Sequence, residues 1–327
     1  MLKENVLELD FDQELKKIKT AIQTSLRVDL KRKGLVVGLS GGIDSSTVAA
    51  LSVAAIGKER VFGLHMPEAD SSPETIDLST MVSDHLGIDS KQEIITPMLE
   101  AFGCYHRRDE AIRQVISEYD SSAGWKSKIV LPSVTDSKSL RFFSVVAISP
   151  KGETVQKRLS PTAYLGIVAA TNFKQRTRKT LEYYHADRLN YAVTGTPNRL
   201  EYDQGFFVKG GDGLADIKPI AHLYKTQVYA MARHLGLPDD ICNRPPTTDT
   251  YSMPQSQEEF YFSLPYDKMD MCLYGINNGF TPEQVAPAVG LQAEQVQWVY
   301  EDIDQKRRTT RYLHLKPCLI EPVTEIE

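Results

Sequence analysis

Residues 34–46 read GLVVGLSGGIDSS, and this stretch decides the fold. Its first six residues, 34–39, form a short, continuous apolar run that is typical of a strand buried on both faces of a parallel sheet. A Gly-rich turn then leads into an Ala-rich segment, 45–56, which predicts a helix. Residues 60–66 (RVFGLHM) predict the next strand, so a β-α-β unit is expected from 34 to 66.

The alternation of strands and helices continues along the chain. Ser72-Pro73-Glu74 predicts a helix start with proline in the first turn, and Gly87 predicts its end. Further strands are expected at 92–96 and at 191–194, the second entered from a long helix over 162–189. This order predicts an α/β fold with a doubly wound, mostly parallel sheet, helices on both faces and a ligand crevice at the carboxyl ends of the strands.

One segment breaks this alternation. Residues 127–160 are rich in β-branched and aromatic side chains, and the turn sequence Ser149-Pro150-Lys151-Gly152 predicts a β-hairpin inserted between two helices. A structural flap is the expected role, with an interface or lid as the alternative. Apolar spacing predicts a further helix over 11–30, and C-terminal helices complete the chain. Because no linker or repeat divides the sequence, residues 1–327 are predicted to form a single domain.

Composition restricts the classes of function. With 327 residues, 41% of them hydrophobic, the chain is long enough to bury a substantial core, and its net charge of -5 gives no reason to expect a nucleic-acid groove. The four cysteines form no CxxC pair, so neither a zinc site nor a disulfide framework is indicated. The N-terminus lacks an apolar signal core and no apolar run is long enough to span a bilayer, so we expect a cytoplasmic protein.

The loop after the first strand predicts a site for an anion of pyrophosphate size. Two glycines let backbone amides approach phosphate oxygens, serine hydroxyls add donors, and the helix N-terminus adds a favourable dipole. The lysine of a GK[ST] loop is absent, so γ-phosphoryl transfer is not the implied reaction. The Asp44 carboxylate suits Mg²⁺ bound to phosphates. The candidate residues are Ser40, Gly41, Gly42, Ile43, Asp44, Ser45 and Ser46. This loop resembles the SGGxDS signature of the ATP pyrophosphatase superfamily, whose members cleave ATP between its α and β phosphates.

A second cluster, over residues 195–220, has the density of glycine and charge expected of a loop around a polar ligand. Basic residues also gather upstream, where Lys174, Arg176, Arg178 and Lys179 predict either a solvated helix face or a phosphate contact. Together with the loop, the chain resembles the NAD+ synthetase family. The resemblance covers roughly residues 11–100 and 160–310. Its motifs are GTPNRLE (195–201), GFFVKGGDGLADIKPI (205–220), LYK (223–225) and PTTD (246–249), with Met66-Pro67, Ser71-Ser72, Asn172 and Arg176 upstream.

The resemblance implies roles for individual residues. It places two Mg²⁺ carboxylates on Asp44 and Glu201, and it makes these two and Lys225 the catalytic residues. The ATP contacts beyond the loop fall on Thr196, Lys225 and Thr247. The contacts to deamido-NAD+ fall on Arg176, Lys209, Asp216 and Lys306.

The activity implied by the resemblance is ammonia-dependent synthesis of NAD+. ATP would adenylate the nicotinate carboxylate of deamido-NAD+, and ammonia would then displace AMP, a far better leaving group than hydroxide or oxide. The chain has no room for a nitrilase-like glutaminase domain, so free ammonia or a separate amidotransferase is the expected donor. A homodimer with substrate bound partly across the interface is also implied.

Departures from the family pattern keep two alternatives open. The chain differs from the family at Gly210, at Leu214, at Phe260-Tyr261 and at Gln305, all of which are expected near the nicotinate side of the pocket. An amide ligase acting on a different carboxylate is therefore one alternative. A catalytically silent nucleotide-binding protein is the other, although it would not need both Asp44 and Glu201.

Overall fold

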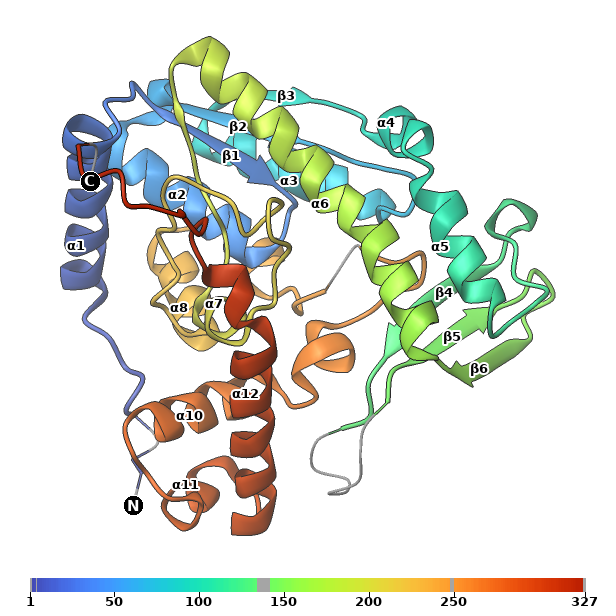
Figure 1. Ribbon diagram of the computed structural model, residues 1–327. Coiled ribbons are helices and arrows are strands. Elements are labelled where there is room, and N and C mark those ends of the chain that lie inside the picture. Colours follow the sequence, from blue (N-terminus) through green and yellow to red (C-terminus); the bar gives the residue numbers. More distant parts are fainter. Residues whose placement is uncertain (1, 4, 134–141, 248–249, 326–327) are drawn as a thin grey trace.

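The computed structural model describes residues 2–3, 5–133, 142–247 and 250–325 (Figure 1). Its centre is a parallel sheet with the strand order β3-β2-β1-β7. The strands are β1 (Leu35–Leu39), β2 (Val61–His65), β3 (Asp89–Gln92) and β7 (Ala192–Val193). Leu35 lies opposite Val61 on one side and Ala192 on the other. The chain thus adds β2 and β3 on one side of β1 and later returns to add β7 on the other side, so the strand order reverses between β1 and β7.

Both faces of this sheet are covered, as the all-apolar β1 predicts. Leu35, Val37 and Leu39 belong to a buried cluster that they share with helices on one face. Val36 belongs to a second cluster on the opposite face. The first face carries α1 (Phe11–Thr24) with the π-helical turn η1 (Ser25–Asp29), α2 (Ile43–Ile56), α3 (Pro73–Leu86) and α8 (Lys225–His234). The second carries α4 (Thr96–Ala101) and α6 (Pro161–Leu189). The predicted α/β fold with helices on both faces is confirmed.

The prediction for the third strand is wrong. The strand is β3 at Asp89–Gln92, and Thr96 already begins α4. All four residues of β3 are exposed because this strand forms the edge of the sheet, so it carries no apolar signature. Ile95, inside the range predicted as a strand, is instead fully buried with the helices of the second face.

The inserted segment forms a three-stranded antiparallel sheet, whereas a two-stranded hairpin was expected. Its order is β4-β5-β6, with β4 (Lys126–Val130), β5 (Ser144–Ile148) and β6 (Thr154–Arg158). The turn at 149–152 joins β5 to β6 as predicted, and Gly152 takes a φ of 84° there. The sheet packs on α5 (Cys104–Arg113) and on the first turns of α6, at one end of the long α6 helix (Figure 1).

The C-terminal helices form a further group below the sheet (Figure 1). They are α10 (Tyr266–Asn277), α11 (Pro282–Val289) and α12 (Ala293–His314), and their cluster of buried residues also includes Leu2. The remaining short elements are η2 (Lys58–Arg60), η3 (Ser121–Ala123), α7 (Arg199–Gln204), α9 (Asp239–Cys242) and η4 (Glu258–Phe262). Within the described ranges, no helix has the length and apolar character needed to cross a membrane.

Candidate functional site

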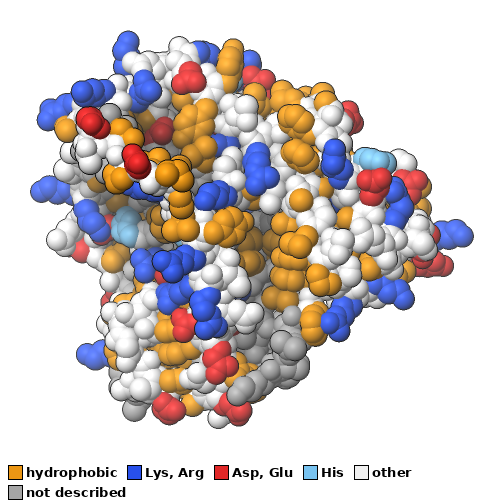
Figure 2. Space-filling view, in the orientation of Figure 1, with side chains coloured by type: hydrophobic (Ala, Val, Ile, Leu, Met, Phe, Trp, Pro, Cys, Tyr) orange, Lys and Arg blue, Asp and Glu red, His pale blue; other side chains and the backbone are white. Residues whose placement is uncertain are grey.

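A cavity of about 820 Å³ opens where β1 and β7 end. Ser40 follows β1 and Thr194 follows β7, and both line this cavity. This is the point at which the strand order reverses, where ligands bind in doubly wound folds. Figure 2 shows a hollow near the middle of the molecular surface, with hydrophobic side chains along its edges.

The loop between β1 and α2 is shaped to receive an anion. Gly41 takes a φ of 71°, and a Cβ there would lie 2.7 Å from the Cβ of Leu78. Ser45 Oγ accepts a hydrogen bond from Ser40 N at 3.3 Å, which closes the turn. Gly42 is the N-cap of α2. The first N–H groups of a helix have no intrahelical acceptors, so those of α2 are available to phosphate oxygens.

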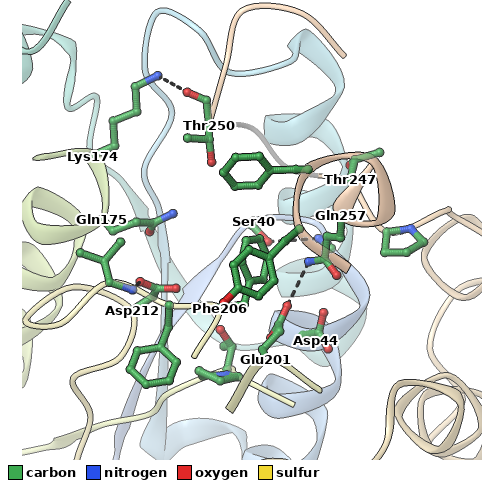
Figure 3. A pocket seen from close by; sticks show the side chains of 18 of the residues that line it. Ser40, Asp44, Lys174, Gln175, Glu201, Phe206, Asp212, Thr247, Thr250 and Gln257 are labelled. Carbon is green, nitrogen blue, oxygen red and sulfur yellow. Dashed lines mark hydrogen bonds between the residues drawn. The ribbon is translucent and has the colours of Figure 1, made fainter. Parts of the chain in front are cut away.

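Asp44, Lys225 and Glu201 come together at this loop. The Lys225 ammonium donates to Asp44 Oδ2. Asn198 Nδ2 donates to Asp44 Oδ1 at 2.9 Å, and Gln257 Nε2 donates to Glu201 Oε1 at 3.0 Å. In Figure 3 the side chains of Ser40, Asp44 and Glu201 lie around the same space, and the dashed line marks the bond from Gln257.

Hydrogen bonds at the helix starts hold the residues of this site in place. Asn198 is fully buried and caps α7, because its Oδ1 accepts from the N–H groups of Leu200 and Glu201 at 3.0 and 3.2 Å. Glu201 closes the capping box by accepting from Asn198 N at 3.2 Å. Asp270 of α10 accepts from Lys225 N at 3.2 Å and so fixes the start of α8.

Burial and like charge shift the titration of this group. Burial, and then the charge of Asp44, raise the pKa of Glu201 to about 8. Burial alone would lower the pKa of Lys225, but the charges of Asp44 and Glu201 outweigh it and raise that pKa. Burial raises the pKa of Asp270 to about 7, against the opposing effect of the N–H groups it caps. Two acidic side chains and one cation therefore share a poorly solvated site.

Asp44 and Glu201 are also the groups that could hold a hard cation. Carboxylate oxygens suit Mg²⁺, which usually takes one or two carboxylates and completes its shell with phosphate and water oxygens. Across the described residues no cluster of three or more His, Cys, Asp or Glu side chains is arranged for a metal ion.

Most of the residues singled out from the sequence line the cavity. They are Ser40, Gly42, Ile43, Asp44, Ser45, Arg176, Thr196, Glu201, Lys209, Lys225, Thr247 and Lys306. Lys209 is exposed and donates to the carbonyl of Tyr312 at 2.7 Å, while buried Lys306 donates to the carbonyl of Tyr261 at 2.7 Å. Thr248 and Asp249 of the PTTD motif lie outside the described residues.

Three of the residues singled out from the sequence do not line the cavity, namely Gly41, Ser46 and Asp216. Asp216 is exposed and accepts from Val193 N at 2.8 Å, beside β7. Among the positions that depart from the family pattern, Phe260, Tyr261 and Gln305 line the cavity, whereas Gly210 and Leu214 do not.

Sequence reasoning did not find the buried ionic network beside the cavity. Lys174 is 1% exposed, and its ammonium donates to Glu68 Oε1 at 2.8 Å and to Asp70 Oδ2 at 2.6 Å. It also donates to the carbonyl of Thr250 at 2.9 Å, the bond drawn at the top of Figure 3. Arg108 adds a second cation, 2.6 Å from Asp70 Oδ2. The solvated helix face considered for Lys174 and Lys179 is wrong, since both are buried.

The chain is similar to known proteins over most of its length. It matches the NAD synthase family model over residues 14–121 and 137–312. It is 55% identical over 323 residues to the NH(3)-dependent NAD(+) synthetase of Rhizobium meliloti (strain 1021), which covers 99% of this chain and 96% of that protein. A protein of the same name from Thermotoga maritima is 32% identical over 277 residues, covering 84% of this chain and 90% of that protein.

Solved structures share the fold. The NMN synthetase from Francisella tularensis superposes with a TM-score of 0.65 at 21% identity, covering 95% of this chain and 99% of that one. The NH3-dependent NAD synthetase from Campylobacter jejuni superposes with a TM-score of 0.61 at 22% identity, covering 96% and 100%. At such low identity the likeness extends to the fold alone.

Proposed function

Because this chain belongs to the NAD synthase family, we propose that its cavity joins ammonia to the nicotinate carboxylate of deamido-NAD+ with cleavage of ATP. The chain is then a ligase that forms a C–N bond. The observation that carries the proposal is the meeting of Asp44, Glu201 and Lys225 at the N-terminus of α2.

The reaction proceeds in two displacements. A carboxylate oxygen of deamido-NAD+ attacks the α phosphorus of ATP, the bond to the β phosphate breaks, and pyrophosphate leaves. Ammonia then attacks the carbonyl carbon of the adenylate, the C–O bond to AMP breaks, and the nitrogen loses a proton. The products are NAD+, AMP and pyrophosphate.

The loop and Lys225 act on the leaving pyrophosphate. The N–H groups at the start of α2 and the hydroxyls of Ser40 and Ser45 are fixed before the substrate arrives, so they need no reorganisation as charge develops on the leaving oxygens. The Lys225 ammonium, which donates to Asp44, is a compact cation that lines the cavity beside this loop. Thr196 and Thr247, which also line the cavity, complete the proposed ATP contacts.

Asp44 and Glu201 are the residues that would hold Mg²⁺. Their carboxylates fit it because they face one cavity beside the phosphate loop and repel each other when both are ionised. When bound, Mg²⁺ neutralises charge on the polyphosphate and on its leaving group. Asn198 and Gln257 hold the two carboxylates in place through the hydrogen bonds described above.

Arg176, Lys209 and Lys306 are the proposed contacts to deamido-NAD+. All three are basic and line the cavity, which suits the two phosphates of a dinucleotide. A role for Asp216 stays a prediction, because its carboxylate is engaged with Val193 N outside the cavity. The homodimer also stays a prediction, which sedimentation of the purified chain would test.

The other two functions considered are not favoured. Relatives that are 55% identical over nearly the whole chain bear the name NH(3)-dependent NAD(+) synthetase, which disfavours a different carboxylate substrate. The same similarity disfavours a silent nucleotide-binding protein. The altered positions Phe260 and Gln305 are then variations within the family's substrate pocket.

An isotope experiment tests the proposal directly. The chain is incubated with ATP, Mg²⁺, ammonium and deamido-NAD+ whose carboxylate carries ¹⁸O, and the products are weighed by mass spectrometry. We expect NAD+ and AMP, with one ¹⁸O transferred to the phosphate of AMP. Formation of ADP, unlabelled AMP or no NAD+ would reject the proposal. Glutamine in place of ammonium serves as the control for the nitrogen donor.

A further inference from the structure

The inserted three-stranded sheet reaches the substrate cavity. Leu131 directly follows β4 and Phe143 directly precedes β5, and both side chains line the cavity. The family model matches residues 14–121 and resumes at 137, so β4 and Leu131 lie outside the part of the chain that it describes. Phe143 and strands β5 and β6 lie within the second matched range, so the match leaves out one strand of the sheet and one of its two cavity-lining residues.

This wall is aromatic. Phe143 stacks on Tyr164 of α6, with ring centroids 4.4 Å apart and planes inclined by 14°. Tyr251 and Phe260 meet edge to face at 5.5 Å and belong to the same apolar cluster. We call these four residues, together with Leu131, the aromatic wall. Phe143, Tyr164 and Phe260 are only half-buried, so apolar ring surface faces the cavity.

Strand β4 also holds the segment that carries the rest of the wall. Ser127 N donates to Ser252 Oγ at 2.9 Å, and Ser127 O accepts from Met253 N at 3.3 Å. The Lys128 ammonium donates to Glu259 Oε2 at 2.8 Å, and Gln255 Nε2 donates to the carbonyl of Ile129. The inserted sheet and residues 251–262 are thereby bound as one unit.

A hydrogen bond connects the segment 251–262 to Glu201. Gln257 lies in the anchored segment and donates to Glu201 Oε1 at 3.0 Å. Figure 3 shows this bond next to Phe206, whose ring meets Phe260 at 5.7 Å. A ring bound against the aromatic wall would therefore lie in the same cavity as Asp44 and Glu201.

We propose that the inserted sheet supplies a specificity-determining wall, with Phe143 at its centre, for a planar heteroaromatic ring of the carboxylate substrate. This inference rests on the proposed function and specifies how the chain recognises its dinucleotide. Planar rings stack or pack edge to face on aromatic side chains, and an N-substituted pyridinium ring gains further attraction from their negative faces. Half-buried aromatic rings together with a few basic side chains are the lining expected of a cavity that binds a ring-bearing anion.

Adjacent residues provide the test and its matched control. Phe143→Ala removes a ring from the wall. Phe142→Ala removes a ring that is 40% exposed, contacts the Arg158 guanidinium on one face and does not line the cavity. Phe143→Leu keeps apolar volume without a π face, and Phe143→Tyr keeps the ring. The KM values for deamido-NAD+ and for ATP are measured separately for each variant, and deamido-NAD+ binding is measured by calorimetry.

For Phe143→Ala we expect the KM for deamido-NAD+ and its dissociation constant to rise about tenfold, with the KM for ATP within about twofold of wild type. Phe143→Leu should show a smaller rise of about threefold, and Phe143→Tyr and Phe142→Ala should stay within about twofold. An unchanged KM for deamido-NAD+ would overturn the inference, as would a rise confined to ATP, which would assign the wall to adenine of ATP. If the wild-type chain bound deamido-NAD+ without converting it, the proposed function would fail while the calorimetry would still decide this inference.

Discussion

The Lys225 ammonium contacts the Asp44 carboxylate, so the first turns of α8 and of α2 meet at the edge of the cavity. The two residues lie 181 positions apart in the sequence. Lys225 is 2% exposed, and its cation also faces the buried carboxyl of Glu201. This contact places one positive charge where two negative groups and an incoming polyphosphate must meet.

Replacing Lys225 by methionine should impair catalysis, because its cation lies between the carboxyl groups of Asp44 and Glu201. We expect kcat/KM for ATP to fall on the order of 10²- to 10³-fold, because the leaving pyrophosphate loses its fixed cation. Pyrophosphate release at saturating deamido-NAD+ measures the effect. Lys17→Met, at an exposed position of α1, is the matched control and should leave the rate unchanged. A Lys225→Met chain with wild-type kcat/KM would exclude the assigned role.

The variant Glu201→Gln should separate stability from turnover. The pKa of Glu201 is raised by burial and by Asp44, so its ionised form costs folding free energy at neutral pH. A neutral amide removes that cost, and we expect the melting temperature in Mg²⁺-free buffer at pH 7 to rise by about 1–3 °C. Turnover should fall on the order of 10²-fold, with little change in ATP binding. A lower melting temperature would contradict the free-energy cost that burial and Asp44 impose on the Glu201 carboxyl.

Asp270 should make stability depend on pH. Its pKa rises from the ordinary 3.8 to about 7 on folding, so the folded chain holds this proton more tightly than the unfolded chain. Its contribution to stability is full below about pH 4 and is lost as the pH rises through 7. In Asp270→Asn this loss disappears, while an oxygen remains to cap α8. Urea unfolding at pH 5 and pH 8 should show wild type losing more stability than the variant by a few kcal/mol. Equal losses would show that Asp270 is not the titrating group.

The two glycines of the phosphate loop should respond differently to alanine. At Gly41 the φ of 71° and the 2.7 Å approach to Leu78 both oppose a Cβ. We expect Gly41→Ala to lose about 1–3 kcal/mol of unfolding free energy. At Gly42 a Cβ meets only Ser40 Oγ, at 3.3 Å, so Gly42→Ala should lose about 1 kcal/mol or less. Denaturant titrations of both variants measure the difference, and equal losses would refute the steric argument.

Removing Lys174 should leave Glu68 and Asp70 as buried, poorly compensated charges. We expect Lys174→Met to lose about 3–5 kcal/mol of unfolding free energy, as is usual when one partner of a buried ion pair is removed. Adding Glu68→Gln and Asp70→Asn to this variant should restore part of the loss, because the charges left behind are then gone. Urea midpoints of the single and triple variants provide the measurement. No recovery in the triple variant would place the effect in packing instead of charge.

Much of the fold could be predicted because the deciding strand is unambiguous. Residues 34–39 are apolar on both faces, and a strand of that kind has to lie inside a sheet covered by helices. Strand β3 escaped prediction for the opposite reason, since its exposed edge position removes the need for apolar residues. The unexpected strand of the insertion is β4, which pairs with the other edge of β5 from across residues 131–143, because no short turn in the sequence announces that pairing.

The site was predictable where the chemistry itself requires particular residues. Asp44 carries charge in a Gly-rich loop, Glu201 and Lys225 stand in motifs that resemble those of the family, and the structure brings the three together. Gln257 could not be found in this way, because a neutral side chain from a distant segment reaches Glu201 only through the anchoring of residues 251–262 on β4. Lys174 was misjudged because net charge along a helix does not reveal its buried carboxylate partners.

The pairing of β1 with β7 has a consequence for biosynthesis. The Thr194 hydroxyl, just beyond β7, donates to the carbonyl of Val36 from 158 positions away. A ribosome therefore releases α2, β2 and most of α6 while one edge of β1 still lacks its neighbour. Such an edge recruits other strands, and closing so long a loop is slow. Nascent chains that stop short of residue 192 should accordingly depend on chaperones or be degraded, and the central sheet is completed only late in translation.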